Sequence, residues 1–318
     1  MHKTDIFPLV TGMAPHSMIY MEQPTRKGAN HMPAKMDITP DMDLQEIMDA
    51  AAPGTVLHLQ AGVYRQKTLL RTPGVTLEGD GMDKTVIIYD DYALKKDEIG
   101  REYNTFRTYT MAICADHVRV RNLAIVNDAL QPKEKGQEVA LSVLGNDFLM
   151  ENCRLASTQD TLFAGPLPDD LIARYDGFLR DELRQKGPSR QIYRHCLIEG
   201  SVDFIFGCAE AVFEECEIRN VYDGRTIGFI AAPAHAQEQT RGFLFLHCRM
   251  TREAQVATGS IYLARPWRDY GLCTFVDCVY DDHIHPDGFD KWNDTERDKT
   301  ARFYETPAVD GRVPWIFV

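Results

Sequence analysis

Long apolar runs and an excess of basic charge are both absent from this sequence. No stretch reaches the roughly 18 to 20 apolar residues that a membrane-spanning helix needs. Acidic residues outnumber basic ones, which gives a formal net charge of −12 at pH 7. Nucleic acids and anionic membranes select proteins that carry a basic face. The composition therefore argues against a membrane protein and against nucleic acid or a membrane as a partner.

An export signal and an interdomain linker are also missing. The first residues, MHKTDIFPLVTGMAPHSMIY, lack the charged start and apolar core of a secretory leader. We therefore expect a cytoplasmic protein, or a secreted one if a leader was trimmed from the sequence. No Ser/Gly-rich segment or shift in composition divides the 318 residues, which favours a single domain. Within it we expect an irregular N-terminal extension (1–41), a repetitive body (42–282) and a C-terminal segment packed on the outside (283–318).

The pairs of cysteines that hold zinc are absent as well. Eight cysteines are present, but no C-x-x-C pair occurs among them. The segment HIHPD places His283, His285 and Asp287 near a surface turn, a pattern more typical of a solvated loop than of a metal site. We expect no metal and no cofactor.

What the cysteines do show is a repeat. Five of them share one local pattern, in which an apolar residue comes three positions before the cysteine and another two positions after it. The five segments are MENCRLAS (Cys153), YRHCLIEG (Cys196), FEECEIRN (Cys216), FLHCRMTR (Cys248) and FVDCVYDD (Cys278). Asn122 in VRVRNLAIVN is assigned to the same place. A short strand-forming unit of about 20 residues, repeated with insertions and with few helical patterns between, predicts an all-β parallel β-helix.

The sequence predicts two further features of this solenoid, a ladder of free thiols and a capping helix. Equivalent residues of neighbouring turns stack about 4.8 Å apart, a geometry unsuited to disulfides, so we expect a ladder of buried free thiols. Ahead of the repeat, DLQEIMDAAAPG places Leu44, Ile47, Met48 and Ala51 on one face of a short helix, which we expect to cap the N-terminal end.

The repeat also brings two aspartates together. Asp203, in the apolar run EGSVDFIFG, follows Cys196 by seven residues, and Asp160, in STQDTLF, follows Cys153 by the same number. The two carboxyls should therefore stack on adjacent turns, provided that residues 164–189 loop out of the repeat. Two such groups among aromatic residues should titrate apart, one with a low and one with a raised pKa, as suits a nucleophile beside a general acid.

The motifs GQEVAL, QDTLF, GSVDFIFG, TIGFIAAPAH, YLARPW and HPDGFDKW, together with the early AGVYRQK, resemble those of pectin methylesterases, the family 8 carbohydrate esterases, in the same order. The resemblance covers roughly residues 42–306. It implies a right-handed parallel β-helix, the pectin-lyase-like solenoid, with a substrate groove along one face. It also implies a pectinesterase that acts on pectin or methylated oligogalacturonides and releases methanol; it leaves the oligomeric state unknown.

The resemblance implies a role for each matching residue. Asp203 resembles the nucleophile and Asp160 the general acid and base; Gln137 and Gln159 resemble the amides that stabilise an oxyanion. Arg265 resembles the guanidinium that orients the nucleophile. The residues that resemble sugar-binding walls are Trp267 and Phe163, and Phe206 of the DFIFG element is assigned with them.

Structural alternatives stay open for several of these residues. The glutamines are also compatible with turn ladders, Trp267 with packing on Pro266, and Phe163 with a plain core position. The sequence departs from the family pattern at three positions: Glu138 and Ser142 stand where alanine and arginine are common, and Phe163 stands for a common tyrosine. The segment 164–189 is longer than usual. These departures bear on substrate length and charge.

Two other functions remain compatible with the sequence. A β-helix polysaccharide lyase or glycoside hydrolase acts on the same polymer, and carboxylates about 5 Å apart also suit retaining glycoside hydrolysis. A catalytically silent carbohydrate-binding solenoid is the third possibility. The release of methanol, new reducing ends or unsaturated uronate from one methylated pectin distinguishes the three.

Overall fold

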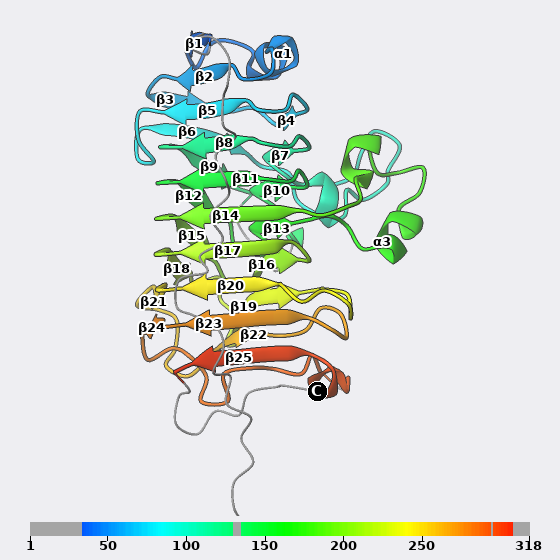
Figure 1. The fold of residues 1–318 in the computed structure, drawn as a ribbon, viewed down its shortest axis with the longest axis vertical. Helices are drawn as coiled ribbons and strands as arrows, with labels where there is room; N and C mark the ends of the chain where they lie inside the picture. The colour runs from blue at the N-terminus through cyan, green and yellow to red at the C-terminus, as the bar shows by residue number, and fades with distance from the viewer. Residues whose placement is uncertain (1–33, 130–134, 294, 308–318) are drawn as a thin grey trace, which may run out of the picture. The chain divides into compact units, whose positions relative to one another are not determined.

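The computed structural model describes residues 34–129, 135–293 and 295–307. Its strands pair in parallel into three sheets, of ten, seven and eight strands (Figure 1). The chain visits the three sheets in turn, so each sheet receives about every third strand. This arrangement is the predicted parallel β-helix. None of the helices in these residues is long and apolar enough to cross a membrane.

Within each sheet, the strands follow one another in space in the same order as in the chain. The ten-stranded sheet contains β1 (Lys35–Ile38), β2 (Val56–Leu59), β5 (Thr76–Gly79), β8 (Arg119–Arg121), β11 (Phe148–Glu151), β14 (Arg190–Arg194), β17 (Glu210–Glu214), β20 (Phe243–Leu246), β23 (Leu272–Val276) and β25 (Arg302–Thr306). The seven-stranded sheet contains β4 (Thr68–Leu70), β7 (Met111–Ile113), β10 (Leu141–Val143), β13 (Leu162–Ala164), β16 (Val202–Gly207), β19 (Gly228–Pro233) and β22 (Ile261–Ala264). The eight-stranded sheet contains β3 (Gly62–Tyr64), β6 (Thr85–Tyr89), β9 (Ala124–Asn127), β12 (Arg154–Ala156), β15 (Leu197–Gly200), β18 (Glu217–Asn220), β21 (Arg249–Arg252) and β24 (Val279–Tyr280).

The cysteine repeat marks one corner of the solenoid. Each of the five cysteines immediately precedes a strand of the eight-stranded sheet, and the pairing of these strands puts all five in equivalent positions. All five are free thiols, and all but Cys278, which is partly exposed, are buried, so the predicted ladder is confirmed except for the burial of its last member. The residue before each cysteine has a left-handed backbone, with φ between 48° and 54°. These residues, which turn the chain into the next strand, are Asn152, His195, Glu215, His247 and Asp277.

The assignment of Asn122 to the cysteine position is wrong by one residue. Arg154 pairs with Ala124, so Leu123 occupies the position equivalent to Cys153. Asn122 has φ 58° and is equivalent to Asn152 at the left-handed corner. An apolar residue belongs at the cysteine position because that position faces the core.

Aromatic rings stack inside the solenoid with the same repeat. Tyr193, Phe213, Phe245 and Phe275 follow one another with ring centroids 4.6 to 4.9 Å apart and nearly parallel planes. This separation matches the roughly 4.8 Å between neighbouring strands, as expected for identical positions on successive turns. The stack begins on the turn that carries Asp203, whereas Met150 occupies the equivalent position on the turn that carries Asp160.

The predicted capping helix is present as α1 (Leu44–Ala50). Asp43 caps its N-terminus by accepting a hydrogen bond from the Glu46 amide, and the side chains of Leu44 and Met48 are buried. Gln45 exchanges two hydrogen bonds with the backbone of Leu69, at 2.7 and 3.0 Å. The amide of Gln45 thus satisfies the open edge of β4 as another strand would.

The segment 164–189 has more structure than the expected loop. It contains helix α3 (Asp169–Arg174) and a 3₁₀ turn, η2 (Asp181–Arg184), and it projects beside β10 and β13 in Figure 1. Four buried leucines hold it against the outer face of the seven-stranded sheet, namely Leu167, Leu171, Leu179 and Leu183. We call residues 164–189 the insertion.

The boundaries of the repeat differ from the prediction at both ends. β25 pairs with β23 over five residues, so this part of 283–318 belongs to the ten-stranded sheet and is not packed outside it. β1 likewise adds a strand within the expected irregular extension. Phe303 of β25 is buried in the core, which explains why the last turn includes these residues. Residues 1–33 and 308–318 lie outside the described part of the chain, and the single-domain organisation stays a prediction.

Candidate active site

Asp160 and Asp203 occupy equivalent positions on neighbouring turns. Gln159 forms a bridge with Val202, and Leu162 of β13 pairs with Ile205 of β16. The paired residues on both sides of the aspartates are separated by the same number of positions, so Asp160 aligns with Asp203. The register that the cysteine spacing predicts is therefore present. Both aspartates are buried, with 8% and 7% of their surface exposed.

The local backbone explains how a charge fits inside an apolar strand. Asp160 and Asp203 have φ of 65° and 49°, in the left-handed region that aspartate tolerates better than most residues. The pairing of β16 with β19 also shifts register between Val202 and Ile205. A bulge of this kind re-aims a side chain out of the regular alternation. Asp203 thereby leaves the strand's apolar pattern while Phe204 remains in the core.

Arg265 holds Asp203 with two hydrogen bonds. Its Nε and Nη2 donate to the two carboxylate oxygens at 2.7 and 2.6 Å. The guanidinium also lies between two aromatic rings, 3.7 Å from the centroid of Phe229 and 4.0 Å from that of Trp292. Planar stacking and a two-pronged ion pair together fix the orientation of the carboxylate.

The two carboxyls have different proton affinities. Burial, and then the charge of Asp203, raise the pKa of Asp160 well above its usual range. Burial also raises the pKa of Asp203, but hydrogen bonds and charge from Arg265 oppose that rise. The prediction of one low pKa is therefore wrong, because burial outweighs the guanidinium. The pKa of Asp160 is still the more strongly raised of the two, which assigns the proton to Asp160 and the negative charge to Asp203.

Gln159 is oriented by a residue that the sequence did not reveal. Arg225 donates from Nη2 to Oε1 of Gln159 at 2.8 Å, and from Nη1 to Oδ2 of Asp223 at 2.9 Å. The side chain of Asp223 is almost fully buried and also accepts a hydrogen bond of 2.5 Å from Ser201. With Oε1 engaged, the Nε2 donor of Gln159 is left for a ligand.

Gln137 and Glu138 lie on the preceding turn. The Glu138 amide donates to the carbonyl of Gln159 at 3.0 Å, which places the pair beside the other glutamine. The Gln137 side chain makes no hydrogen bond with the described residues and keeps its donors available. Glu138 is 1% exposed; its Oε2 accepts from Thr158 at 2.8 Å, whereas Oε1 has no partner in the described part of the chain. Burial raises the pKa of Glu138.

The aromatic residues beside the carboxyls are not equally accessible. Trp267 is partly exposed, but Phe163 and Phe206 are only 1% and 3% exposed. Phe106 lies within 6.4 Å, ring centroid to centroid, of all three. Phe163 and Phe206 therefore offer no open face to a sugar here, and we assign them to the support of Phe106 and Trp267. For Phe163, this agrees with the alternative of a core position.

The insertion contributes one further ring. Tyr175 is partly exposed and lies 5.9 Å from Phe106, centroid to centroid. Asp170 of α3 accepts a hydrogen bond of 2.9 Å from Arg268, the neighbour of Trp267. The insertion thus contributes to an aromatic patch formed by Tyr175 and Trp267, which are partly exposed, and Phe106, which is buried beneath them.

Histidines of the HIHPD segment are engaged in packing. His283 is buried and contacts Asn220 through Nε2 at 3.2 Å, and the ring of His285 stacks on Tyr262. Within the described residues, no group of three or more His, Cys, Asp or Glu side chains could hold a metal ion.

Both the family model and the curated relatives that this chain matches are pectinesterases. The family model described as Pectinesterase matches residues 39–166 and 176–313. The chain is 29% identical to Pectinesterase QRT1 of Arabidopsis thaliana, over 88% of this chain and 67% of that protein. It is also 29% identical to Pectinesterase 31 of the same plant, over 86% and 82%. Some Arabidopsis relatives are much longer, since the chain spans 31% and 45% of two pectinesterase/pectinesterase inhibitor proteins.

Solved structures agree with the fold. The pectin methylesterase from Yersinia enterocolitica superposes with a TM-score of 0.70 at 26% identity, covering 85% of this chain and 92% of that one. The matched family segments exclude residues 167–175, which lie in the insertion. Part of the insertion is therefore an internal segment that the family pattern does not share.

Proposed function

Because this chain belongs to the pectinesterase family, we propose that it hydrolyses galacturonate methyl esters to a free carboxylate and methanol. The substrate class is pectin or methylated oligogalacturonides. The observation that carries this proposal is the carboxyl group of Asp203, which Arg265 binds through both oxygens, stacked on the neighbouring turn beside Asp160, whose pKa is raised well above its usual range. A carboxylate nucleophile and a neighbouring acid are the two groups that ester cleavage through a covalent intermediate needs.

In the first step, a carboxylate oxygen of Asp203 forms a bond to the ester carbon. The carbonyl oxygen becomes an oxyanion, which the free Nε2 donors of Gln159 and Gln137 stabilise. As the intermediate collapses, the bond to methoxide breaks and Asp160 transfers its proton to that oxygen. Methanol departs, and the substrate acyl group is held as an anhydride on Asp203.

The second step restores both aspartates. Asp160, now ionised, accepts a proton from water while the water oxygen attacks the same acyl carbon. The bond to Asp203 breaks, the galacturonate carboxyl is released, and Asp160 again holds the proton that the next cycle requires. Arg265 stabilises the Asp203 carboxylate at the start and at the end of the cycle.

We further propose that the chain prefers short methylated oligogalacturonides to long pectin. The insertion supports this preference, because it contributes Tyr175 to the aromatic patch and its Asp170 binds Arg268, the neighbour of Trp267. Retention in the cytoplasm, where only imported fragments would be met, would suit the same preference. The test is kcat/KM for methanol release on short oligomers and on long pectin. A much higher value on long pectin contradicts the preference.

The reaction itself is tested on one methylated pectin sample. We expect methanol without new reducing ends and without unsaturated uronate. Reducing ends without methanol would indicate a glycoside hydrolase, and unsaturated products would indicate a lyase. The absence of all three products would indicate a binding protein.

A further inference from the structure

Two segments meet across the outer face of the seven-stranded sheet, on one side of the aspartates. Residues 90–110 lead into the N-terminal end of β7, whereas the insertion leaves the C-terminal end of β13. Because the strands are parallel, the two segments start from opposite edges of the sheet. They nevertheless contact each other, since the Phe178 ring centroid lies 4.3 Å from the guanidinium carbon of Arg107 and 5.1 Å from that of Arg101. We call residues 90–110 and the insertion, joined at this contact, the bridge (Figure 1).

The two arginines of the bridge are held in place by a carboxylate. Asp97 accepts hydrogen bonds from Nε of Arg101 at 3.2 Å and from Nη1 of Arg107 at 3.4 Å. A guanidinium over an aromatic ring is attracted by the electrons of the ring. The insertion is also tied to the edge of the sheet, because Glu182 accepts a hydrogen bond of 2.9 Å from Arg71, which follows β4. The contact between the two segments is therefore supported from both sides.

The bridge covers the outer face of the sheet from β4 to β13. One residue from each of these four strands occupies the same row of the sheet: Leu69, Ala112, Ser142 and Phe163. Leu69, Ala112 and Phe163 pack with the leucines of the insertion, outside the core of the solenoid. All four residues are at most 2% exposed. An outward-facing residue of a sheet is buried only where another segment covers it, so this stretch of the face is closed to a long ligand.

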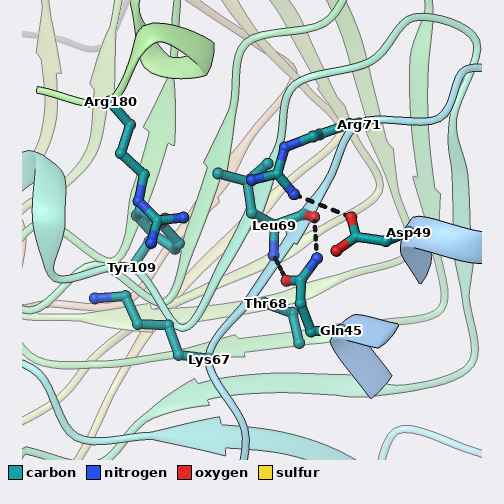
Figure 2. A pocket seen from close by; sticks show the side chains of 8 residues that line it. All are labelled: Gln45, Asp49, Lys67, Thr68, Leu69, Arg71, Tyr109 and Arg180. Atoms are coloured by element: carbon teal, nitrogen blue, oxygen red, sulfur yellow. Dashed lines mark hydrogen bonds and ion pairs between the residues drawn. The ribbon is translucent and has the colours of Figure 1, made fainter. Parts of the chain in front are cut away.

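The space beside β4 is too small for a chain of sugars. A cavity of about 180 Å³ lies there, and its lining includes Lys67, Tyr109 and Arg180. Figure 2 shows the Arg180 side chain extending from the insertion toward Tyr109 and Lys67. A cavity of about 150 Å³ holds a single benzene ring, so a chain of several sugar rings cannot continue through this space.

The outer face is open in part on the other side of the aspartates. Phe229 of β19 and Tyr262 of β22 are partly exposed, and their rings stack with centroids 5.6 Å apart. Phe229 also lies against Arg265, which binds Asp203. In the order of the sheet, β19 and β22 follow the aspartates, whereas β4, β7 and β10 precede them. A substrate chain can therefore extend from Asp203 toward β22 but not toward β4.

We propose that the bridge stops the substrate chain beside the aspartates, so that the enzyme removes methyl groups at one end of an oligogalacturonide. An internal ester of a long chain needs room for sugar residues on both sides of Asp203, and the bridge occupies one of these sides. Phe178 and Arg107, which join the two segments, are then specificity-determining residues. The inference rests on the proposed function, because it states which ester of the same substrate reaches Asp203.

The test is the position of the first ester that the whole chain hydrolyses in a fully methylated hexagalacturonide. Tandem mass spectrometry of the product that has lost a single methyl group locates the free carboxyl. We expect it on the terminal or the penultimate sugar of one end in nearly all molecules. Free carboxyls spread over the internal sugars would overturn the proposal.

Two variants then test the residues that join the bridge. Phe178→Ala removes the ring, and Arg107→Gln removes a cation that lies over it. Asp181→Ala is the matched control, because Asp181 is an exposed residue of the same insertion and its ion pair, with Arg184 at 3.6 Å, stays within the insertion. In Phe178→Ala we expect internal products and a rise of about tenfold in kcat/KM on long pectin relative to that on short oligomers. Arg107→Gln should change both in the same direction, and Asp181→Ala should change neither.

The outcomes separate the bridge from the esterase. The thermal unfolding temperature shows whether each variant is folded. Unchanged products and an unchanged ratio of kcat/KM values in folded Phe178→Ala and Arg107→Gln proteins would refute the role of the bridge. Methanol released from internal sugars by the unmodified chain would refute the bridge and leave the esterase standing. The absence of methanol from every methylated substrate would refute the esterase, and this inference with it.

Discussion

Arg225 donates a hydrogen bond of 2.8 Å to the side-chain oxygen of Gln159, 66 residues earlier in the chain. An amide side chain has one accepting and one donating end, and only the donating end can stabilise an oxyanion. By engaging Oε1, Arg225 selects the orientation in which Nε2 is available for catalysis. Asp223 and Ser201 hold Arg225 in place through their own hydrogen bonds.

The first prediction concerns this orientation. Removing an oxyanion donor outright typically costs about 10² to 10³ in kcat, so Arg225→Met, which only releases the amide, should lower kcat about 10- to 100-fold and change KM little. Arg241→Met, at an exposed arginine with a long ion pair to Glu210, is the control. Steady-state kinetics of methanol release measure both. A kcat within twofold of the unmodified chain would show that Arg225 does not orient Gln159.

The second prediction is that Arg265→Lys is costly although the charge is kept. An ammonium cannot donate in parallel to both oxygens of Asp203, nor stack as a plane between Phe229 and Trp292. Charge-assisted hydrogen bonds contribute about 1.5 to 3 kcal/mol, so we expect kcat to fall roughly 10- to 100-fold. The thermal unfolding temperature serves as the check on folding. Full activity in a well-folded Arg265→Lys protein would refute the role of the paired geometry.

The third prediction concerns pH and Glu138. Burial and Asp203 raise the pKa of Asp160, and the charge of Glu138 adds to that rise. Asp160 must be protonated to act as the acid, so activity should fall as pH increases through its raised pKa. Glu138→Gln removes one negative neighbour, lowers the pKa of Asp160 and should move this alkaline limb to lower pH.

The pH–rate profile of kcat in the two proteins measures the shift. Glu253→Gln is the control, because Glu253 is an acceptor in a part of the chain away from the aspartates, where it binds the Tyr222 amide. An alkaline limb that stays in place or moves to higher pH in Glu138→Gln would contradict the coupling of Glu138 to Asp160.

Much of the site could be predicted from the sequence because it follows the repeat. The spacing of Cys153 and Cys196 sets the register, and the register alone places Asp160 beside Asp203. Positions that recur on every turn obey the geometry of stacked strands, and that geometry is the same throughout the solenoid.

Contacts outside the repeat could not be predicted in this way. Arg225 lies in an irregular segment between β18 and β19, and nothing in its local sequence marks a partner 66 residues earlier. The burial of Phe163 and Phe206 depends on Phe106, which reaches them from the segment before β7. The insertion is polar and contains proline, which predicts a loop, and only the packing on the sheet shows that its leucines are buried.

The fourth prediction tests the stacking itself. Cys153, Cys196, Cys216, Cys248 and Cys278 are free thiols in equivalent positions. All five should react with a thiol reagent after denaturation without reductant, and a reductant should leave the unfolding temperature unchanged. Mass spectrometry of the intact chain counts the modified thiols. Disulfides among these five would contradict the register that brings the two aspartates together.

The fifth prediction, on the division of labour between Asp203 and Asp160, carries the central claim. Methanol release from a methylated oligogalacturonide by Asp203→Ala and Asp160→Asn, side by side, tests it most directly. Asp203 forms the covalent bond, so Asp203→Ala should lose nearly all activity. Asp160 only moves protons, a contribution of about 10² to 10⁴ in rate, so Asp160→Asn should keep a trace of activity that lacks the alkaline limb. Near-normal activity in Asp203→Ala, together with a dead Asp160→Asn, would contradict the account and require water as the nucleophile.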